Sequence, residues 1–160
     1  MLKRFVKYIL LLTLFTNAYS AEIDIDKLLQ QAKKQNKLIM FFHHIPGCSY
    51  CKRMLDENFK DPNILEVVNK NFIHVDIYTG DKDLVKFKKF SGTCKEFSVY
   101  IGAVAYPATI FMNSKGEVLH TAIGYRNIDE HFADITYMST ESYKVMDLES
   151  YKEKLEFEKD

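Results

Sequence analysis

Residues 38–51 read LIMFFHHIPGCSYC, and this stretch decides the fold. Its first part, residues 38–42, is a continuous apolar run of the kind that forms a strand buried on both faces of a sheet. Residues 52–58 then read as a helix. The Cys48-x-x-Cys51 pair is therefore predicted to lie where a buried strand leads into a helix.

This position suits disulfide exchange. A helix N-terminus offers free N–H groups and a favourable dipole, and both stabilise a thiolate. A spacing of two residues lets the second thiol reach back along the first helical turn and resolve a mixed disulfide. We therefore predict a redox-active disulfide in which Cys48 is the exposed nucleophile and Cys51 the more buried resolving thiol.

Two other interpretations of the pair remain open. A static structural disulfide is one, although closing a two-residue loop constrains the unfolded chain little. The other is a carrier of copper or another metal that uses the pair with His43 or His44. Structural zinc sites normally have a second ligand pair at a suitable spacing, so no metal site is predicted. Successive strand residues point to opposite faces, so at most one of these histidines can face the thiols.

Helices and strands alternate along the rest of the chain. Helices are expected from Asp24 or Asp26 to about Asn36, from Asp61-Pro62, over 82–90, over 95–100, from Asn127 or Asp129, and from about residue 139. Strands are expected over 72–77, 108–112 and 118–123, the last two joined by a turn at 113–116. This order predicts an α/β fold with a mixed central sheet, helices on both faces and an extra C-terminal helix.

The bulk properties fit one globular domain. The chain has 160 residues, a formal net charge of zero and 47% hydrophobic residues, which is enough for a single core. The charge balance points neither to nucleic acid nor to an anionic membrane surface as a partner.

Residues 1–20 are predicted to be a signal peptide. The segment begins with basic residues, continues with a short apolar run over 8–15, and ends with the small residues Ala18 and Ser20 before Ala21. An uncleaved membrane anchor is the alternative, but a spanning helix needs about 20 apolar residues. Cleavage after Ser20 leaves a domain over 21–160 with a net charge of about −3. The expected product is exported to the periplasm, where disulfides persist, and has no stable membrane association.

Together, these motifs resemble the thioredoxin superfamily. The strand before the cysteines, the Cys-x-x-Cys motif that opens a helix, and Tyr106-Pro107 before a strand carry the resemblance. The run NFKDPNI over 58–64, followed by NFI over 71–73, resembles more particularly the periplasmic thioredoxin-like domains of the thiol:disulfide interchange and sulfur-oxidation-associated types. The resemblance covers roughly residues 25–138.

The resemblance implies a thioredoxin fold and an oxidoreductase that reduces protein disulfides without an organic cofactor. It also implies that Pro107 is a cis-proline facing the active site and that the backbone of Tyr106 binds the substrate chain. The implied partners are protein disulfide clients and an upstream membrane electron donor. A disulfide isomerase or oxidase is the alternative within this class; no dimerisation region is visible, so a monomer is expected.

The sequence departs from thioredoxin at the motif. Phe42 stands six residues before Cys48, where thioredoxin has a buried acid that serves the resolving thiol. His44 and His74 are the candidates to replace that acid. Gly47 stands in place of the tryptophan before the motif, and Ser49-Tyr50 in place of Gly-Pro.

Cys94, the third cysteine, is interpreted as a buried small apolar residue, with a third redox thiol or an intermolecular link as the alternative. The lysines at 82, 86, 88 and 89 are interpreted as the solvent-exposed face of the helix expected over 82–90.

Overall fold

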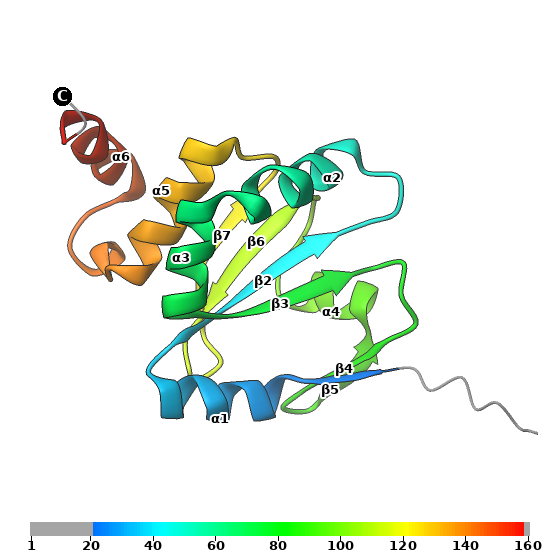
Figure 1. The fold of residues 1–160 in the computed structure, drawn as a ribbon. Helices are drawn as coiled ribbons and strands as arrows, with labels where there is room; N and C mark the ends of the chain where they lie inside the picture. The colour runs from blue at the N-terminus through cyan, green and yellow to red at the C-terminus, as the bar shows by residue number, and fades with distance from the viewer. Residues whose placement is uncertain (1–20, 159–160) are drawn as a thin grey trace, which may run out of the picture.

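The computed structural model describes residues 21–158, which form a four-stranded central sheet (Figure 1). Its strands lie in the order β3 (Phe72–Tyr78), β2 (Leu38–His44), β6 (Ala108–Met112) and β7 (Val118–Ile123). β2 and β3 are parallel, whereas β6 runs antiparallel to both β2 and β7. The predicted mixed sheet is therefore confirmed. The expected signal peptide, residues 1–20, lies outside the described residues.

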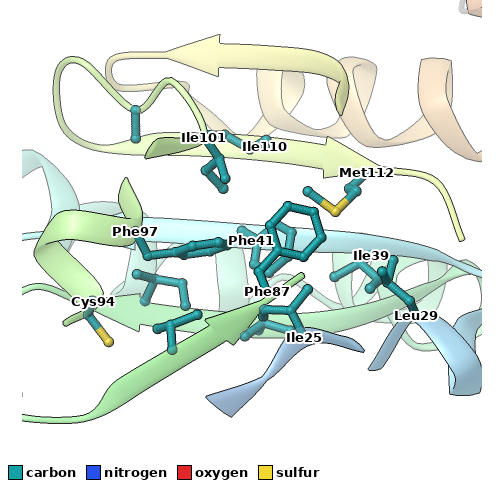
Figure 2. Close-up of a cluster of buried hydrophobic side chains, with 14 of the residues drawn as sticks. Ile25, Leu29, Ile39, Phe41, Phe87, Cys94, Phe97, Ile101, Ile110 and Met112 are labelled. Atoms are coloured by element: carbon teal, nitrogen blue, oxygen red, sulfur yellow. The ribbon is translucent and has the colours of Figure 1, made fainter. Parts of the chain in front are cut away.

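Helices cover both faces of this sheet, as predicted. α2 (Ser49–Asp56), α3 (Pro62–Asn71) and α5 (Ile128–Ser139) lie on one face, and α1 (Ile25–Gln35) and α4 (Cys94–Tyr100) lie on the other (Figure 1). Alternate side chains of β2 point to opposite faces and so enter two separate cores. Phe41 packs with residues of α1 and α4 (Figure 2), whereas Met40 packs with residues of α3 and α5.

Side-chain caps explain why three helices begin near the predicted residues. Asp24 caps α1, Asp61 caps α3 and Asn127 caps α5, and each accepts a hydrogen bond from a backbone N–H of the first turn. Pro62 follows at the first turn of α3, where its missing N–H costs nothing. α1 ends at Asn36, which adopts the left-handed conformation that terminates many helices.

The helix predicted over 82–90 is wrong, because β4 (Leu84–Phe87) and β5 (Phe90–Thr93) form a hairpin there. Val85 and Phe87 are buried while the residues on either side of Val85 are exposed, which is the period of two of a strand. β1 (Glu22–Asp24) pairs in parallel with β4, so these strands form a second, three-stranded sheet. Lys86 and Lys88 therefore belong to a hairpin and not to a helix face. The short helix predicted over 95–100 is confirmed as α4.

The C-terminal helix starts later than predicted. α5 continues to Ser139, the short turn η2 (Ser142–Lys144) follows, and α6 (Leu148–Phe157) begins only after its cap, Asp147. Glu141 has a positive φ of 58°, which interrupts the helix, and Val145 is 78% exposed. Tyr151 is buried with residues of α3 and α5, so α6 covers the core as expected. Within residues 21–158, no helix is long and apolar enough to cross a bilayer.

Candidate redox site

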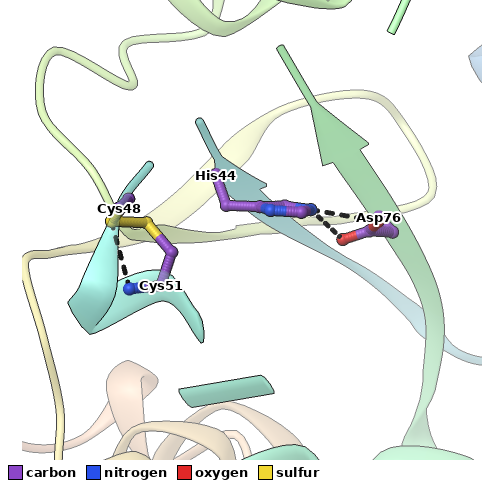
Figure 3. Close-up of a disulfide and its surroundings, with 4 residues drawn as sticks. All are labelled: His44, Cys48, Cys51 and Asp76. Carbon is purple, nitrogen blue, oxygen red and sulfur yellow. Dashed lines mark hydrogen bonds and ion pairs between the residues drawn. A yellow bond between two sulfur atoms is a disulfide. The ribbon is translucent and has the colours of Figure 1, made fainter. Parts of the chain in front are cut away.

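The cysteine pair lies where β2 leads into α2 (Figure 3). Cys48 is the N-cap residue of α2, and its Sγ accepts a hydrogen bond of 3.1 Å from the Cys51 N–H. A disulfide joins the two residues, whose Cα atoms are 5.2 Å apart. In the dithiol form, the same N–H group and the helix dipole would stabilise a thiolate on Cys48.

The two sulfur-bearing residues differ in exposure. Cys51 is 1% exposed, whereas Cys48 is half-buried. A groove of about 300 Å³ opens beside the pair and is formed by residues 44–49, the first turns of α2 and Tyr78. An incoming thiol or disulfide therefore reaches Cys48 more readily than Cys51, which is the asymmetry that dithiol exchange needs.

Tyr106 and Pro107 lie at the same end of the sheet as the cysteine pair. The peptide bond between them is cis, and Pro107 directly precedes β6. The first residue of β6, Ala108, pairs with His43 near the end of β2. Pro107 is buried and Tyr106 is half-buried. Both residues therefore lie at the end of the sheet that carries Cys48.

His44 borders the groove and is oriented by three neighbours. Its ring stacks on Phe42 and on Tyr78, with centroid separations of 5.4 and 4.7 Å. Its Nε2 lies 2.9 and 3.1 Å from the two carboxylate oxygens of Asp76, and Figure 3 shows the ring pointing toward Asp76 and away from the disulfide. The carboxylate accepts a hydrogen bond from Nε2–H, which leaves Nδ1 as the nitrogen able to accept a proton.

Aromatic packing fills the position of the buried acid that thioredoxin has. Phe42 is fully buried, and its ring centroid lies 4.7 Å from that of Phe59. His74, on β3, stacks almost parallel on Phe59 with an interplanar angle of 7° and does not line the groove. Of the two candidate replacements for the acid, His44 lines the same groove as the cysteine pair and His74 does not.

His43 faces the other side of the sheet from His44, as expected. Its Nδ1 lies 2.8 Å from the Ser98 Oγ, and the Ser98 hydroxyl donates to the Cys94 carbonyl at 2.9 Å. The histidine must therefore donate from Nδ1, which places its proton there. Burial lowers the pKa of His43 to about 3, so it is neutral at physiological pH.

The described residues give the metal-carrier interpretation no support. Within residues 21–158, no three His, Cys, Asp or Glu side chains lie close enough together to hold a metal ion. This interpretation uses His43 or His44, and each of them already has a hydrogen-bond partner, Ser98 for His43 and Asp76 for His44.

Cys94 is confirmed as a buried apolar residue. It is 1% exposed and packs in the same cluster as Phe97 (Figure 2). Burial raises the pKa of its thiol to about 11, which keeps it protonated. A client protein cannot reach this sulfur without opening of the core.

Sequence reasoning missed the side chains that surround the pair. Tyr125 places its ring 5.3 Å from that of Tyr50, and the Arg53 guanidinium lies 5.1 Å from the Tyr125 centroid. Asp76, the partner of His44, was also missed. A weak sequence pattern does mark Asp76, because it is an exposed acid between two buried residues of an apolar strand. No local pattern identifies Tyr125.

Comparisons with known proteins agree with this geometry. A model of the thioredoxin-like domain matches residues 25–138. Mouse anterior gradient protein 3 is 36% identical over 58 residues, which are 35% of this chain and 35% of that protein, so the match spans about a third of the relative.

A thioredoxin-fold protein from Helicobacter pylori superposes with a TM-score of 0.65 and 14% identity, over 85% of this chain and 89% of its own. A putative disulphide-isomerase from Bacteroides thetaiotaomicron superposes with a TM-score of 0.59 and 24% identity, over 78% and 93%. These two structural likenesses concern the fold.

Proposed function

Because this chain belongs to the thioredoxin-like domain family, we propose that it is a thiol:disulfide oxidoreductase that reduces protein disulfides. The observation that carries the proposal is the asymmetry of the pair: Cys48 caps α2 and borders the groove, whereas Cys51 is buried one turn inside. The same asymmetry argues against a purely structural disulfide, which would need neither an accessible sulfur nor a groove.

The reaction proceeds by two exchanges. The Cys48 thiolate attacks one sulfur of a client disulfide, so that a Cys48–client bond forms and a client thiolate leaves and takes up a proton. Cys51 then loses its proton and attacks the Cys48 Sγ, which breaks the mixed disulfide and releases the second client thiolate, protonated in turn. Two electrons pass to the client, and the protein is left with the Cys48–Cys51 disulfide. A membrane-bound dithiol donor restores the dithiol form.

The other predicted residues have supporting roles in this reaction. The backbone of Tyr106, before the cis-proline Pro107, binds the client chain beside Cys48. His44 receives the Cys51 proton through the groove, because both residues border it and Asp76 leaves the His44 Nδ1 as the acceptor. The protein works as a monomer, and no organic cofactor or metal takes part.

A measured reduction potential and an insulin-reduction assay test the proposal. We expect a potential closer to about −270 mV, as in thioredoxin, than to about −120 mV, as in a strong oxidant. With a dithiol donor, the wild type should reduce insulin and Cys48→Ser should not. Cys94→Ala is the matched control and should retain the activity, because this cysteine is buried away from the groove. A potential near that of the oxidant, or refolding of scrambled disulfides without net reduction, would replace the reductase by an oxidase or an isomerase.

Export to the periplasm is the second part of the proposal. The Ala21 nitrogen lies 3.0 Å from the Asp83 Oδ1, and β1 begins at Glu22, so cleavage after Ser20 would leave every strand described in residues 21–158 intact. Mass spectrometry of protein produced with its own leader should find Ala21 as the first residue in the periplasmic fraction. A full-length cytosolic product would contradict export.

A further inference from the structure

The loop between β7 and α5, residues 124–127, touches both sides of the redox site. The Gly124 N–H donates to the Pro107 carbonyl at 2.8 Å, which ties the loop to the cis-proline. The next residue, Tyr125, packs its ring against Tyr50, which lies between the two cysteines and is 59% exposed. We call Tyr50 and Tyr125 together the tyrosine wall. Its place beside Cys48 depends on the conformation of this loop.

A buried side-chain amide bonds the loop to the short helix that follows α2. Asn58, in the short helix η1 (Asn58–Lys60), is fully buried. Its Nδ2 donates to the carbonyl of Arg126 at 2.9 Å and lies 3.2 Å from the carbonyl of Asn127, both in the loop. Burying an amide without partners is unfavourable, so these two contacts specify where the loop can sit against η1.

Arg126, which belongs to the loop, bonds both to α5 and to the backbone near the loop itself. The Arg126 Nε donates to the Asp134 carboxylate at 3.2 Å, and its Nη1 donates to the carbonyls of Ile123 at 3.2 Å and Tyr125 at 3.3 Å. Asp134 is fully buried on α5, so Arg126 joins the loop to the helix that follows it. A buried ion pair adds little net stability because desolvation offsets the attraction. What this one supplies is a defined geometry for the Tyr125 backbone.

We propose that Asn58 and Arg126 are positioning residues for client binding: they fix the loop so that the tyrosine wall forms one side of the surface that receives a client beside Cys48. Tyr50 and Tyr125 present large, rigid apolar area at little entropic cost, as aromatic residues do at other binding surfaces. The wall therefore favours client segments with an aromatic or aliphatic residue next to the cysteine. This assignment rests on the proposed disulfide reduction, and the experiment below separates the two.

The first measurement compares protein and small-molecule disulfides. In Asn58→Leu and Arg126→Gln, we expect the KM for insulin to rise about tenfold, equivalent to about 1.4 kcal/mol, with kcat within twofold. The rate with 5,5′-dithiobis(2-nitrobenzoate), which is too small to need the wall, and the reduction potential should stay unchanged. Tyr137→Phe is the matched control: it removes a 2.7 Å hydrogen bond to the Met146 carbonyl at the other end of α5 and should leave the KM unaltered.

The second measurement asks whether Arg126 acts through Tyr125. Tyr125→Ala should raise the KM to a similar extent, and adding Arg126→Gln to it should have no further effect, because the two changes remove the same wall. Additive effects would overturn the positioning role, as would equal losses with the small disulfide.

The third measurement needs no activity. Nuclear Overhauser contacts between the Tyr50 and Tyr125 rings should be present in the wild type and in Tyr137→Phe and absent in Asn58→Leu and Arg126→Gln. Retention of these contacts in the last two variants would overturn the proposal even if the reductase assay succeeded. A wild type with the ring contacts but no reduction of insulin would instead refute the proposed function and, with it, the role of the wall in client binding.

Discussion

At the scale of single residues, the start of α2 makes the two cysteines unequal. The Cys51 N–H points at the Cys48 sulfur, whereas the Cys51 side chain is buried under the first turn. Free N–H groups at a helix start lower the pKa of a cysteine beside them. This geometry supports the proposed role of Cys48 as the attacking residue.

This difference predicts that Cys51→Ala traps client proteins. Without the resolving thiol, the mixed disulfide on Cys48 cannot be released by internal attack, so disulfide-linked partners should accumulate. Non-reducing gels and mass spectrometry of the exported variant measure this. The double variant Cys48→Ala, Cys51→Ala should trap nothing. Trapping by Cys48→Ala and none by Cys51→Ala would reverse the assigned roles.

The geometry of His44 predicts its effect on resolution of the mixed disulfide. His44→Gln should slow the attack of Cys51 by about a hundredfold at neutral pH, the lower end of what a positioned general base contributes. His74→Gln is the control, because His74 does not line the groove. Single-turnover release of a thiol from a preformed Cys48 mixed disulfide measures the rate. Equal effects of the two substitutions would exclude the proton-acceptor role of His44.

The cysteine pair could be predicted from sequence because its signal is local: an apolar run followed directly by Cys-x-x-Cys. The residues that shape its surroundings could not. Asn58 reaches the Arg126 carbonyl across a separation of 68 residues, and the contact is to backbone, so no residue type in the loop reports it. The packing of Tyr125 against Tyr50 likewise exists only after the sheet has closed.

At the scale of elements, the residues that mark the ends of helices and strands explain which elements could be predicted from the sequence. β6 and β7 match the predicted residues because two apolar runs flank a turn that contains Gly116. The strands β4 and β5 were missed because a lysine-rich stretch also has the composition of a solvated helix. What makes β4 a strand is its parallel pairing with β1, in which Val85 pairs with Ile23, and a pattern of neighbouring residues cannot show that pairing.

The start of α3 predicts a measurable contribution of its cap. The Asp61 carboxylate accepts hydrogen bonds from the N–H groups of Asn63 and Ile64 at 3.0 and 3.1 Å. Asp61→Ala should lower the free energy of unfolding by about 1 kcal/mol, with Tm falling by about 2–4 °C. Asp61→Asn keeps an acceptor oxygen and should lose much less. Urea unfolding of the oxidised proteins makes the comparison, and equal losses in both variants would mean that the cap does not stabilise the helix.

At the scale of the whole molecule, buried histidines and a buried aspartate change the pH dependence of stability in opposite directions. Burial lowers the pKa of His43, on the α4 side, to about 3 and that of His131, on the α5 side, to about 4. Burial raises the pKa of Asp134 to about 6, although the nearby cations Arg126 and Lys152 act in the opposite direction. The two histidines resist protonation in the folded state, and the aspartate resists ionisation.

These shifts predict how stability depends on pH between about 4 and 6.5. An unfolded histidine binds a proton near pH 6.5. Each buried histidine therefore contributes stability at neutral pH that is lost as the pH falls below that value. Asp134 affects stability in the opposite direction. Its stabilising contribution is present below the unfolded pKa of about 3.9 and is lost as the pH rises through the folded pKa of about 6. Burial also lowers the pKa of His74 and of His120, which adds to the effect of the first two histidines. The unfolded state therefore binds at least one more proton near pH 5, so the free energy of unfolding should fall by about 1.4 kcal/mol per pH unit or more as the solution is acidified.

Two substitutions should change this slope in opposite directions. His43→Gln removes one proton that the unfolded state takes up, so the slope near pH 5 should flatten by about 1.4 kcal/mol per pH unit. Asp134→Asn removes the proton that the folded state takes up, so the slope should steepen by nearly the same amount. Urea unfolding of the oxidised proteins at pH 4.5, 5.5 and 6.5 measures all three slopes, and comparing slopes cancels any loss of stability that is the same at every pH. If Asp134→Asn left the slope unchanged, the carboxylate would be ionised in the folded protein throughout this range, and the Arg126–Asp134 contact would be a full ion pair even in acid.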